Sequence, residues 1–326
     1  MSLYSNIYFY GGGAWGQALA ISLASIDHSS TLIVSDKSRE QEINNHISKR
    51  FPEIQLSNLI TASAENREEL ALSDLIFITT ESKRVIKSIK EIVSFNDKAN
   101  IVITSKGFAD NSGTLFNQII KEQFPSIKLS VLTGPTFADE IAKNQPAAAI
   151  VASEDLTNAK SICQLFHNSN LRLYPSNDIK GASIAGAVKN IIAIGAGIIH
   201  GLGLGDNAKA ALITRGISET SSLIEKLGGN PQTAFGLAGI GDMSLTCSGP
   251  HSRNMSYGIE ITKDINSKPR SLVEGLNAIE ATINLSKKFD LELPIVFAIS
   301  KYINKEANIE ETIRKLFSRP IKNEFE

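Results

Sequence analysis

The first half of the chain alternates short apolar runs with polar segments that are compatible with helices. The apolar runs cover residues 7–10, 31–34, 59–61, 75–78, 101–104 and 129–132, and two more follow at 147–151 and 171–174. Strands that alternate with helices predict a parallel sheet with right-handed crossovers. Runs that are apolar along their whole length suit a sheet buried on both faces. Beyond about residue 178 the pattern becomes helical, which predicts a second, all-helical domain.

Charge and composition exclude several classes of protein. The 326 residues carry a formal net charge of -1, and 42% of them are hydrophobic. A balanced charge gives no bulk attraction to nucleic acid, and the apolar content excludes a wholly disordered chain. Only two cysteines are present, so we expect neither a disulfide framework nor a metal site, and a cytoplasmic location follows.

The most apolar stretch runs over residues 181–205 and contains Lys189, Asn190 and His200. These polar residues leave apolar pieces too short to cross about 30 Å of hydrocarbon. We therefore predict a buried core helix and no membrane span.

A glycine motif follows the first apolar run at once. Gly11, Gly13 and Gly16 fit the pattern G-x-G-x-x-G, and Asp36 follows the second run, twenty residues after Gly16. In that context the first glycine permits a tight turn, the second admits a pyrophosphate and the third lets helix and strand pack closely. The motif predicts a dinucleotide site in a Rossmann-like domain, with the alternative of a purely structural turn.

The choice between NAD and NADP stays open at this level. Asp36 would hydrogen-bond the ribose hydroxyls and repel a 2′-phosphate, which favours NAD. Lys37 and Arg39 lie beside it and could bind that phosphate, or they could be solvated charges at a helix start.

Two lysines lie at positions where a charged side chain indicates a functional site. Lys106 follows the run at 101–104 by two residues, and ligands of open α/β sheets bind at the carboxyl ends of strands. Lys189 lies in a segment that is apolar nearly all round, where an unpaired ammonium would be very costly. Asp242, in a second glycine-rich segment, is a candidate partner. The alternatives are that Lys106 is an exposed loop lysine, that Lys189 forms a structural ion pair or extends its ammonium to the surface, and that Asp242 caps a helix.

Two further segments could contact a ligand. Arg253 stands at a predicted loop-to-helix junction, and its guanidinium suits bidentate binding of phosphate, although a surface charge is the alternative. Thr136 and Asp139 resemble a helix-capping pair, and the same segment could present backbone N–H groups to a ligand.

Several motifs in one order resemble a known family. They are GGGAWGQALA at 11–20, SKG at 105–107, TGPTFA at 133–138, GAVKNIIAIGAG at 186–197, ALITRG at 211–216, GIGDMSLTC at 239–247, SRN at 252–254 and VEG at 273–275. Together they resemble the soluble, bacterial-type NAD(P)-dependent glycerol-3-phosphate dehydrogenases over essentially the whole chain. The resemblance implies an α/β fold, with a Rossmann-like parallel-sheet domain at 1–178 and an all-helical substrate domain at 179–326. It also implies a homodimer.

The resemblance implies a role for each matching residue. Lys189 would donate and accept the proton, beside Lys106, Asp242 and Thr246. Substrate positions are Lys106, Gly134, Thr136, Lys189, Asp242, Ser252, Arg253 and Asn254. Cofactor positions are Gly11, Gly13, Ala14, Trp15, Gly16, Ser35, Asp36, Lys106, Ala138, Arg253, Leu272 and Glu274. The implied reaction interconverts dihydroxyacetone phosphate and sn-glycerol 3-phosphate with NADH or NADPH and supplies glycerophospholipid synthesis.

The chain departs from the family at three positions. Ala14 replaces a serine, Leu272 replaces a valine, and Ser35-Asp36 stands where the family often has Arg or His. The last change leaves preference for NADP open. Two other functions remain as alternatives: a related dehydrogenase of hydroxy acids, and a non-catalytic dinucleotide sensor.

Overall fold

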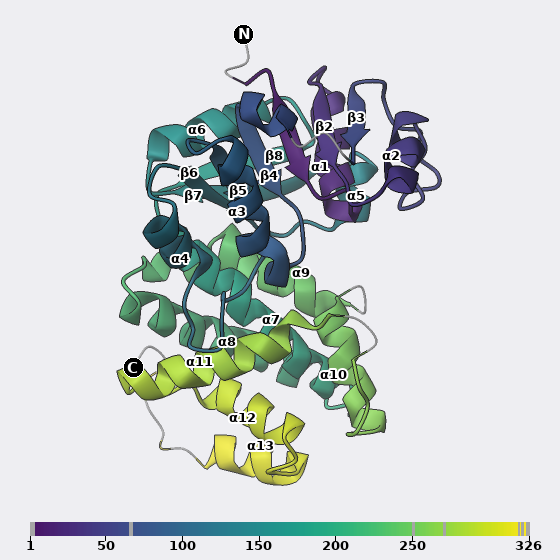
Figure 1. Cartoon of the computed structure of the whole chain (residues 1–326). Helices are drawn as coiled ribbons and strands as arrows, with labels where there is room; N and C mark the ends of the chain where they lie inside the picture. The colour runs from purple at the N-terminus through teal and green to yellow at the C-terminus, as the bar shows by residue number, and fades with distance from the viewer. Residues whose placement is uncertain are drawn as a thin grey trace.

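The computed structural model describes residues 4–64, 68–249, 252–269, 272–318, 320 and 323. Within this part of the chain, eight strands form one sheet in the order β3-β2-β1-β4-β5-β6-β7-β8. The strands are β1 (Ile7–Tyr10), β2 (Ser30–Ile33), β3 (Ile60–Ser63), β4 (Leu75–Ile78), β5 (Asn100–Ile103), β6 (Lys128–Thr133), β7 (Ala147–Ser153) and β8 (Leu171–Ser176). Figure 1 shows the sheet and its helices in the upper half of the molecule. The eight apolar runs each became a strand.

The predicted parallel sheet is confirmed, with one antiparallel pair that the sequence did not predict. The strands from β3 to β6 are parallel, and β7 and β8 are parallel to each other, but β7 pairs with β6 in the antiparallel sense. Between β6 and β7 lies only the five-residue helix α5 (Ala138–Ala142). This short helix packs against α1 (Ala14–Ala24). The chain then runs back beside β6, so that Ser130 pairs with Ser153 and Thr133 with Ile150.

Helices cover both faces of the sheet. The remaining helices of this part are α1 (Ala14–Ala24), α2 (Lys37–Asn44), η1 (Glu68–Leu72), η2 (Ser82–Arg84), α3 (Val85–Phe95), α4 (Phe116–Gln123) and α6 (Leu156–Leu165). Alternate residues of one strand point to opposite faces, so Phe9 and Phe77 pack with α1 and α6 while Ile76 packs with α3 and α4. The central strand β4 is buried on both faces, as its uninterrupted apolar run predicts, whereas Arg172 and Tyr174 of the edge strand β8 are exposed.

The helical part of the chain follows β8. Its elements are α7 (Ile179–Gly201), α8 (Asp206–Lys226), η3 (Pro231–Phe235), η4 (Leu237–Gly241), α9 (Asp242–Ser248), α10 (Arg253–Lys263), α11 (Glu274–Phe289), α12 (Pro294–Ile303) and α13 (Ile309–Phe317). In Figure 1 they occupy the lower half, with α7 among them. The predicted boundary between residues 178 and 179 coincides with the N-cap of α7, and the division into two domains there stays a prediction.

Helix α7 is the centre of the helical part. By length and composition it could cross a membrane, but 89% of its most apolar stretch is buried inside the protein, as expected of a core helix. Glycines allow α10 to cross it closely: a Cβ on Gly197 would collide with the Met255 carbonyl, and one on Gly258 with the Ile194 carbonyl. The crossing fixes the start of α10 beside the middle of α7.

Candidate active site

A buried carboxylate joins two lysines at the junction of the sheet and the helices. The Lys189 ammonium donates to Asp242 Oδ1 at 2.6 Å and to Thr246 Oγ1 at 2.9 Å. The Lys106 ammonium donates to Asp242 Oδ2 and, at 3.3 Å, to the Gly134 carbonyl. We call Lys189, Asp242 and Lys106 the charge cluster. Lys189, whose ammonium would be very unfavourable in an apolar helix without a partner, is therefore paired with Asp242.

Three different elements supply the charge cluster. Lys106 follows β5 at the carboxyl end of the sheet, Lys189 lies in the middle of α7, and Asp242 is the first residue of α9. The absence of a side chain at Gly186, one turn before Lys189, leaves room for Lys106: a Cβ there would lie 3.4 Å from its Cγ. Asp242 therefore binds the lysines and is not a helix cap.

Burial and charge act against each other in this cluster. Burial lowers the pKa of Lys189 to about 8, although the Asp242 carboxylate partly restores it. Burial alone would raise the pKa of Asp242, but Lys106 and Lys189 outweigh it and hold that pKa below its ordinary value. The cluster thus holds one carboxylate in its ionised form and one lysine that can gain or lose a proton near neutral pH.

The predicted ligand segment 252–254 forms the N-terminus of α10. Ser252 is the N-cap and its hydroxyl accepts from the Met255 N–H, while the Arg253 side chain is exposed. The Asn254 amide is buried: it donates to Asn190 Oδ1 at 2.9 Å and accepts from the Gly275 N–H at 2.9 Å. Since Asn190 follows Lys189 in α7, this amide pair fixes the Arg253 end of α10 relative to the charge cluster.

Glu274 lies between the two groups of charges. Burial raises its pKa, and Arg253, Lys189 and Lys106 each act in the opposite direction, so all three cations lie within electrostatic range of this carboxylate. Its Oε1 also accepts a hydrogen bond from Ser82 in η2 at 3.3 Å. One side chain of α11 thereby connects the helical part to the loop after β4.

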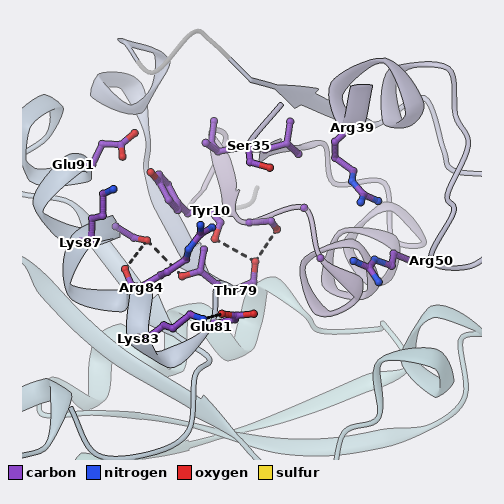
Figure 2. Close-up of a pocket in the computed structure, with 17 residues that line it drawn as sticks. Tyr10, Ser35, Arg39, Arg50, Thr79, Glu81, Lys83, Arg84, Lys87 and Glu91 are labelled. Atoms are coloured by element: carbon purple, nitrogen blue, oxygen red, sulfur yellow. Dashed lines mark hydrogen bonds and ion pairs between the residues drawn. The ribbon is translucent and has the colours of Figure 1, made fainter. Parts of the chain in front are cut away.

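A cavity of about 630 Å³ opens at the carboxyl ends of β1, β2 and β4. Its lining residues are Tyr10, Gly11, Gly12, Gly13, Ile33, Val34, Ser35, Arg39, Arg50, Thr79, Thr80, Glu81, Lys83, Arg84, Lys87, Ser88 and Glu91. Figure 2 shows Arg39 and Arg50 on one side of it and Arg84, Lys87 and Glu91 on the other. The Ser105 hydroxyl, next to Lys106, donates to the Thr80 carbonyl at 2.6 Å, which connects the cavity wall to the charge cluster.

The glycine loop fits a dinucleotide. A Cβ on Gly16 would collide with the Gly11 carbonyl, so this glycine is required for the close packing of helix and strand. Gly11 adopts φ 126°, which disfavours other residues. A Cβ on Gly13 would meet nothing within 4 Å, so the space before it is open, and no side chain caps α1 there. Free N–H groups and open space at a helix N-terminus are what a pyrophosphate needs.

Some predicted residues lie elsewhere. Asp36 does not line the cavity: it is the N-cap of α2 and accepts from the Arg39 N–H at 2.9 Å, which, with the Ser35 hydroxyl, lowers its pKa. Ser35 lines the cavity in its place. Thr136 and Asp139 do not form a capping pair, because α5 begins at Ala138 and the Thr136 hydroxyl donates to the Gly134 carbonyl.

Other predicted cofactor positions do not line the cavity. Ala14 and Trp15 open α1, Ala138 opens the neighbouring α5, and Leu272 is partly buried just before α11. Sequence reasoning missed Arg50, Ser82 and Asn190. Of these, Asn190 carried a signal, since it is a second polar residue inside the apolar helix.

Family models match both parts of the chain. The model described as NAD-dependent glycerol-3-phosphate dehydrogenase N-terminus matches residues 6–159, and the corresponding C-terminus model matches residues 178–314. The chain belongs to this family. The identification by resemblance is thereby confirmed.

Individual members of the family align with this chain over nearly its whole length. The chain is 38% identical to glycerol-3-phosphate dehydrogenase [NAD(P)+] of Francisella tularensis subsp. novicida, an alignment that covers 99% of this chain and 100% of the relative. Among solved structures it is similar to glycerol-3-phosphate dehydrogenase from Coxiella burnetii, with a TM-score of 0.87, 28% identity, and coverage of 97% and 99% of the two chains. D-mandelate dehydrogenase, at 15% identity and a TM-score of 0.61, shares 92% of this chain's length and supports the fold alone.

Proposed function

We propose that the protein reversibly reduces dihydroxyacetone phosphate to sn-glycerol 3-phosphate with NADH or NADPH. The observation that carries the proposal is the buried Lys189–Asp242–Lys106 cluster, placed beside a glycine-loop cavity. The printed names of the relatives describe an NAD(P)+-dependent enzyme of glycerol 3-phosphate, which supports the same reaction.

Lys189 is the proton donor and acceptor in this proposal. When bound, the nicotinamide dinucleotide supplies the hydride that the C2 carbonyl carbon of the substrate accepts. Negative charge then develops on the C2 oxygen, and the Lys189 ammonium can hydrogen-bond that oxygen and protonate it. In the opposite direction neutral Lys189 removes the hydroxyl proton, and its lowered pKa of about 8 makes the neutral form accessible.

Lys106 and Asp242 prepare Lys189 for this role. The Asp242 carboxylate, together with the Thr246 hydroxyl, holds the Lys189 ammonium in one position. Lys106 adds positive potential at the same place, which would stabilise a developing oxyanion beside the buried carboxylate of Asp242. The whole cluster is preorganised, because its three members come from rigid elements or from the strand end next to them.

The N-terminus of α10 is the proposed phosphate site. Arg253 is exposed there, next to the helix N-terminus, and both features favour an anion. The Asn254 amide donates one of its two protons to Asn190, and we propose that it donates the other to the phosphate. Remote binding of the phosphate would position the carbonyl against Lys189.

The test is the decay of NADH and of NADPH absorbance with purified protein. Dihydroxyacetone phosphate is compared with unphosphorylated dihydroxyacetone and with ketopantoate. We expect decay that requires dihydroxyacetone phosphate. Decay with ketopantoate alone would indicate a related dehydrogenase, and cofactor binding without decay on any substrate would indicate a sensor.

The rate should depend on pH in opposite senses in the two directions. Reduction needs the Lys189 ammonium, so its kcat/KM should fall above pH 8, whereas oxidation needs the neutral amine, so its kcat/KM should rise toward the same pH and then level off. Measurement of kcat/KM from pH 7 to 10 in both directions checks this. Profiles that run in the same sense would contradict Lys189 as the titrating group, and cofactor affinity over this range is the control.

The biological setting follows from the family resemblance alone. We infer a cytoplasmic homodimer whose product enters glycerophospholipid synthesis. Light scattering of the purified protein tests the dimer, and a monomer at working concentration would remove that part of the proposal.

A further inference from the structure

A loop that follows Lys106 leaves the sheet and docks on α11. Residues 107–114, which we call the strap, lead from Lys106 toward α4. At its tip the Asp110 carboxylate accepts from the N–H groups of Ser112 at 2.9 Å and Thr114 at 3.2 Å. Figure 1 shows the segment between β5 and α4 extending down to α11. The tip of the strap is therefore an ordered turn that lies against the helical part of the chain.

The tip is bound to one face of α11. The Asn111 amide donates to Glu280 Oε2 at 2.8 Å, and the Asn111 carbonyl accepts from the Asn284 amide at 2.9 Å. Glu280 and Asn284 are four residues apart, so they share a face of the helix. Gly113 is buried with φ 89°, and a Cβ there would collide with the buried Leu285 side chain. Polar and apolar contacts thus hold the strap on α11.

The chain is fixed differently before and after Lys106. Before it, the Ser105 hydroxyl donates to the Thr80 carbonyl at 2.6 Å. After it, the chain turns at Gly107 with φ 137°, where a Cβ would meet no described atom within 4 Å. A cavity of about 10 Å³ borders Lys106 and Thr133, whose buried hydroxyl has no hydrogen-bond partner in the described part of the chain. The sheet therefore does little to fix the chain beyond Lys106, and the tip of the strap does so instead.

Helix α11 is a fixed reference for the charge cluster. It packs against α7, and its Gly275 lies so close that a Cβ there would be 2.7 Å from the Asn190 carbonyl oxygen. Asn190 follows Lys189 in the chain. Glu274, the first residue of α11, lies within electrostatic range of both Lys189 and Lys106. A strap that is docked on α11 is thereby held relative to Lys189.

We propose that the docked strap positions Lys106 for the reaction, which makes Glu280 and Asn284 positioning residues. This inference rests on the proposed function, because it concerns the role that Lys106 has there. Without the contacts to α11, the Lys106 ammonium would spend less time against Asp242 and would add less positive potential beside Lys189.

The pKa of Lys189 reports the position of Lys106. Lys106 lowers that pKa, whereas the Asp242 carboxylate raises it. Glu274 of α11 and Cys247 of α9 also lie within electrostatic range of Lys189, and the test variants change neither. Release of the strap should therefore raise the pKa of Lys189 and move the fall of kcat/KM for reduction to higher pH.

The test replaces both anchors on α11 at once, with Glu280→Ala and Asn284→Ala in one protein. Both side chains are exposed, so the fold should be retained, and thermal melts check this. We expect kcat for reduction of dihydroxyacetone phosphate to fall about 10-fold, the size expected for losing two ordinary hydrogen bonds. The pH at which kcat/KM begins to fall should rise toward that of Lys106→Met, which sets the largest shift that loss of this ammonium can cause.

Two variants on the same helix serve as controls. Glu280→Gln removes the same charge but keeps an oxygen that can accept from Asn111, so it should retain most of the rate and the wild-type pH profile. Asn277→Ala removes an exposed asparagine that forms no hydrogen bond with the described residues of the strap, and it should change neither measurement.

Three results would overturn the inference. Wild-type kcat in the double variant would show that the anchors do not position Lys106. A fall in kcat with an unchanged pH profile would indicate a general structural effect, because a smaller folded fraction lowers the rate alike at each pH. An unshifted profile in Lys106→Met would remove the coupling between the two lysines. Absence of turnover by the wild-type protein would instead refute the proposed function, so the two failures are distinguishable.

Discussion

Lys189→Ala is expected to lower kcat for reduction of dihydroxyacetone phosphate about 10³-fold or more, the size typical of losing a general acid together with oxyanion stabilisation. The proton donor of the reaction would be gone, and the carboxylate of Asp242 would remain with Lys106 alone. Affinity for NADH should change little, because Lys189 does not line the cofactor cavity. Steady-state kinetics and calorimetry with NADH measure the two effects.

A matched control lies on the same helix. Lys180→Ala removes a lysine near the N-terminus of α7 that takes no part in the charge cluster, and it should leave kcat unchanged. Near-normal turnover of Lys189→Ala would refute the assigned role. A fall in kcat accompanied by an equal loss of NADH affinity would indicate a distorted fold rather than lost chemistry.

Asp242→Ala is expected to lower the free energy of unfolding by about 3–5 kcal/mol, the cost of removing one partner from a buried ion pair. Asp242 is 2% exposed, and its removal would leave the ammonium groups of Lys106 and Lys189 close together without the carboxylate that bridges them. Urea unfolding at pH 7 measures the loss. Activity should fall as well, since Lys189 would lose the carboxylate that orients it.

A second substitution separates charge from packing. Adding Lys106→Met to Asp242→Ala removes one of the two uncompensated cations, so part of the lost stability should return. If the double variant were no more stable than Asp242→Ala, the role of Asp242 would be packing. In Asp242→Asn, which keeps the volume, the pKa of Lys189 should fall further, because the carboxylate that raises it is gone. The pH at which kcat/KM for reduction begins to fall would then be lower.

The predicted strands are accurate because burial on both faces leaves a local mark. A strand such as β4, Leu75–Ile78, is apolar at every position, so the sequence predicts it without knowledge of the strands beside it. The glycine loop is also recognisable from a short stretch of sequence, because the tight turn requires a glycine at Gly11 and the close packing of helix and strand requires one at Gly16. The direction of β7 is not local, because it depends on how α5 and β7 pack beside α1 and β6.

The charge cluster was predicted in part. A lysine inside an apolar helix must have a partner, so Lys189 is informative from the sequence alone. That Asp242 bridges it to Lys106, across 53 and 136 residues of sequence, depends on the packing of α9 against α7 and the end of β5. The pKa of Lys189 also follows from that packing, since desolvation is its largest cause.

The sequence by itself determined the alternation of strands and helices, the glycine loop and the buried lysine, because each is a requirement on neighbouring residues. The tertiary structure alone decided the reversal of β7, the pairing of Asn190 with Asn254, and the use of Asp36 as a helix cap while Arg50 enters the cavity. These features depend on distances between segments far apart in the chain, and on competition among partners for one polar group, which no local pattern records.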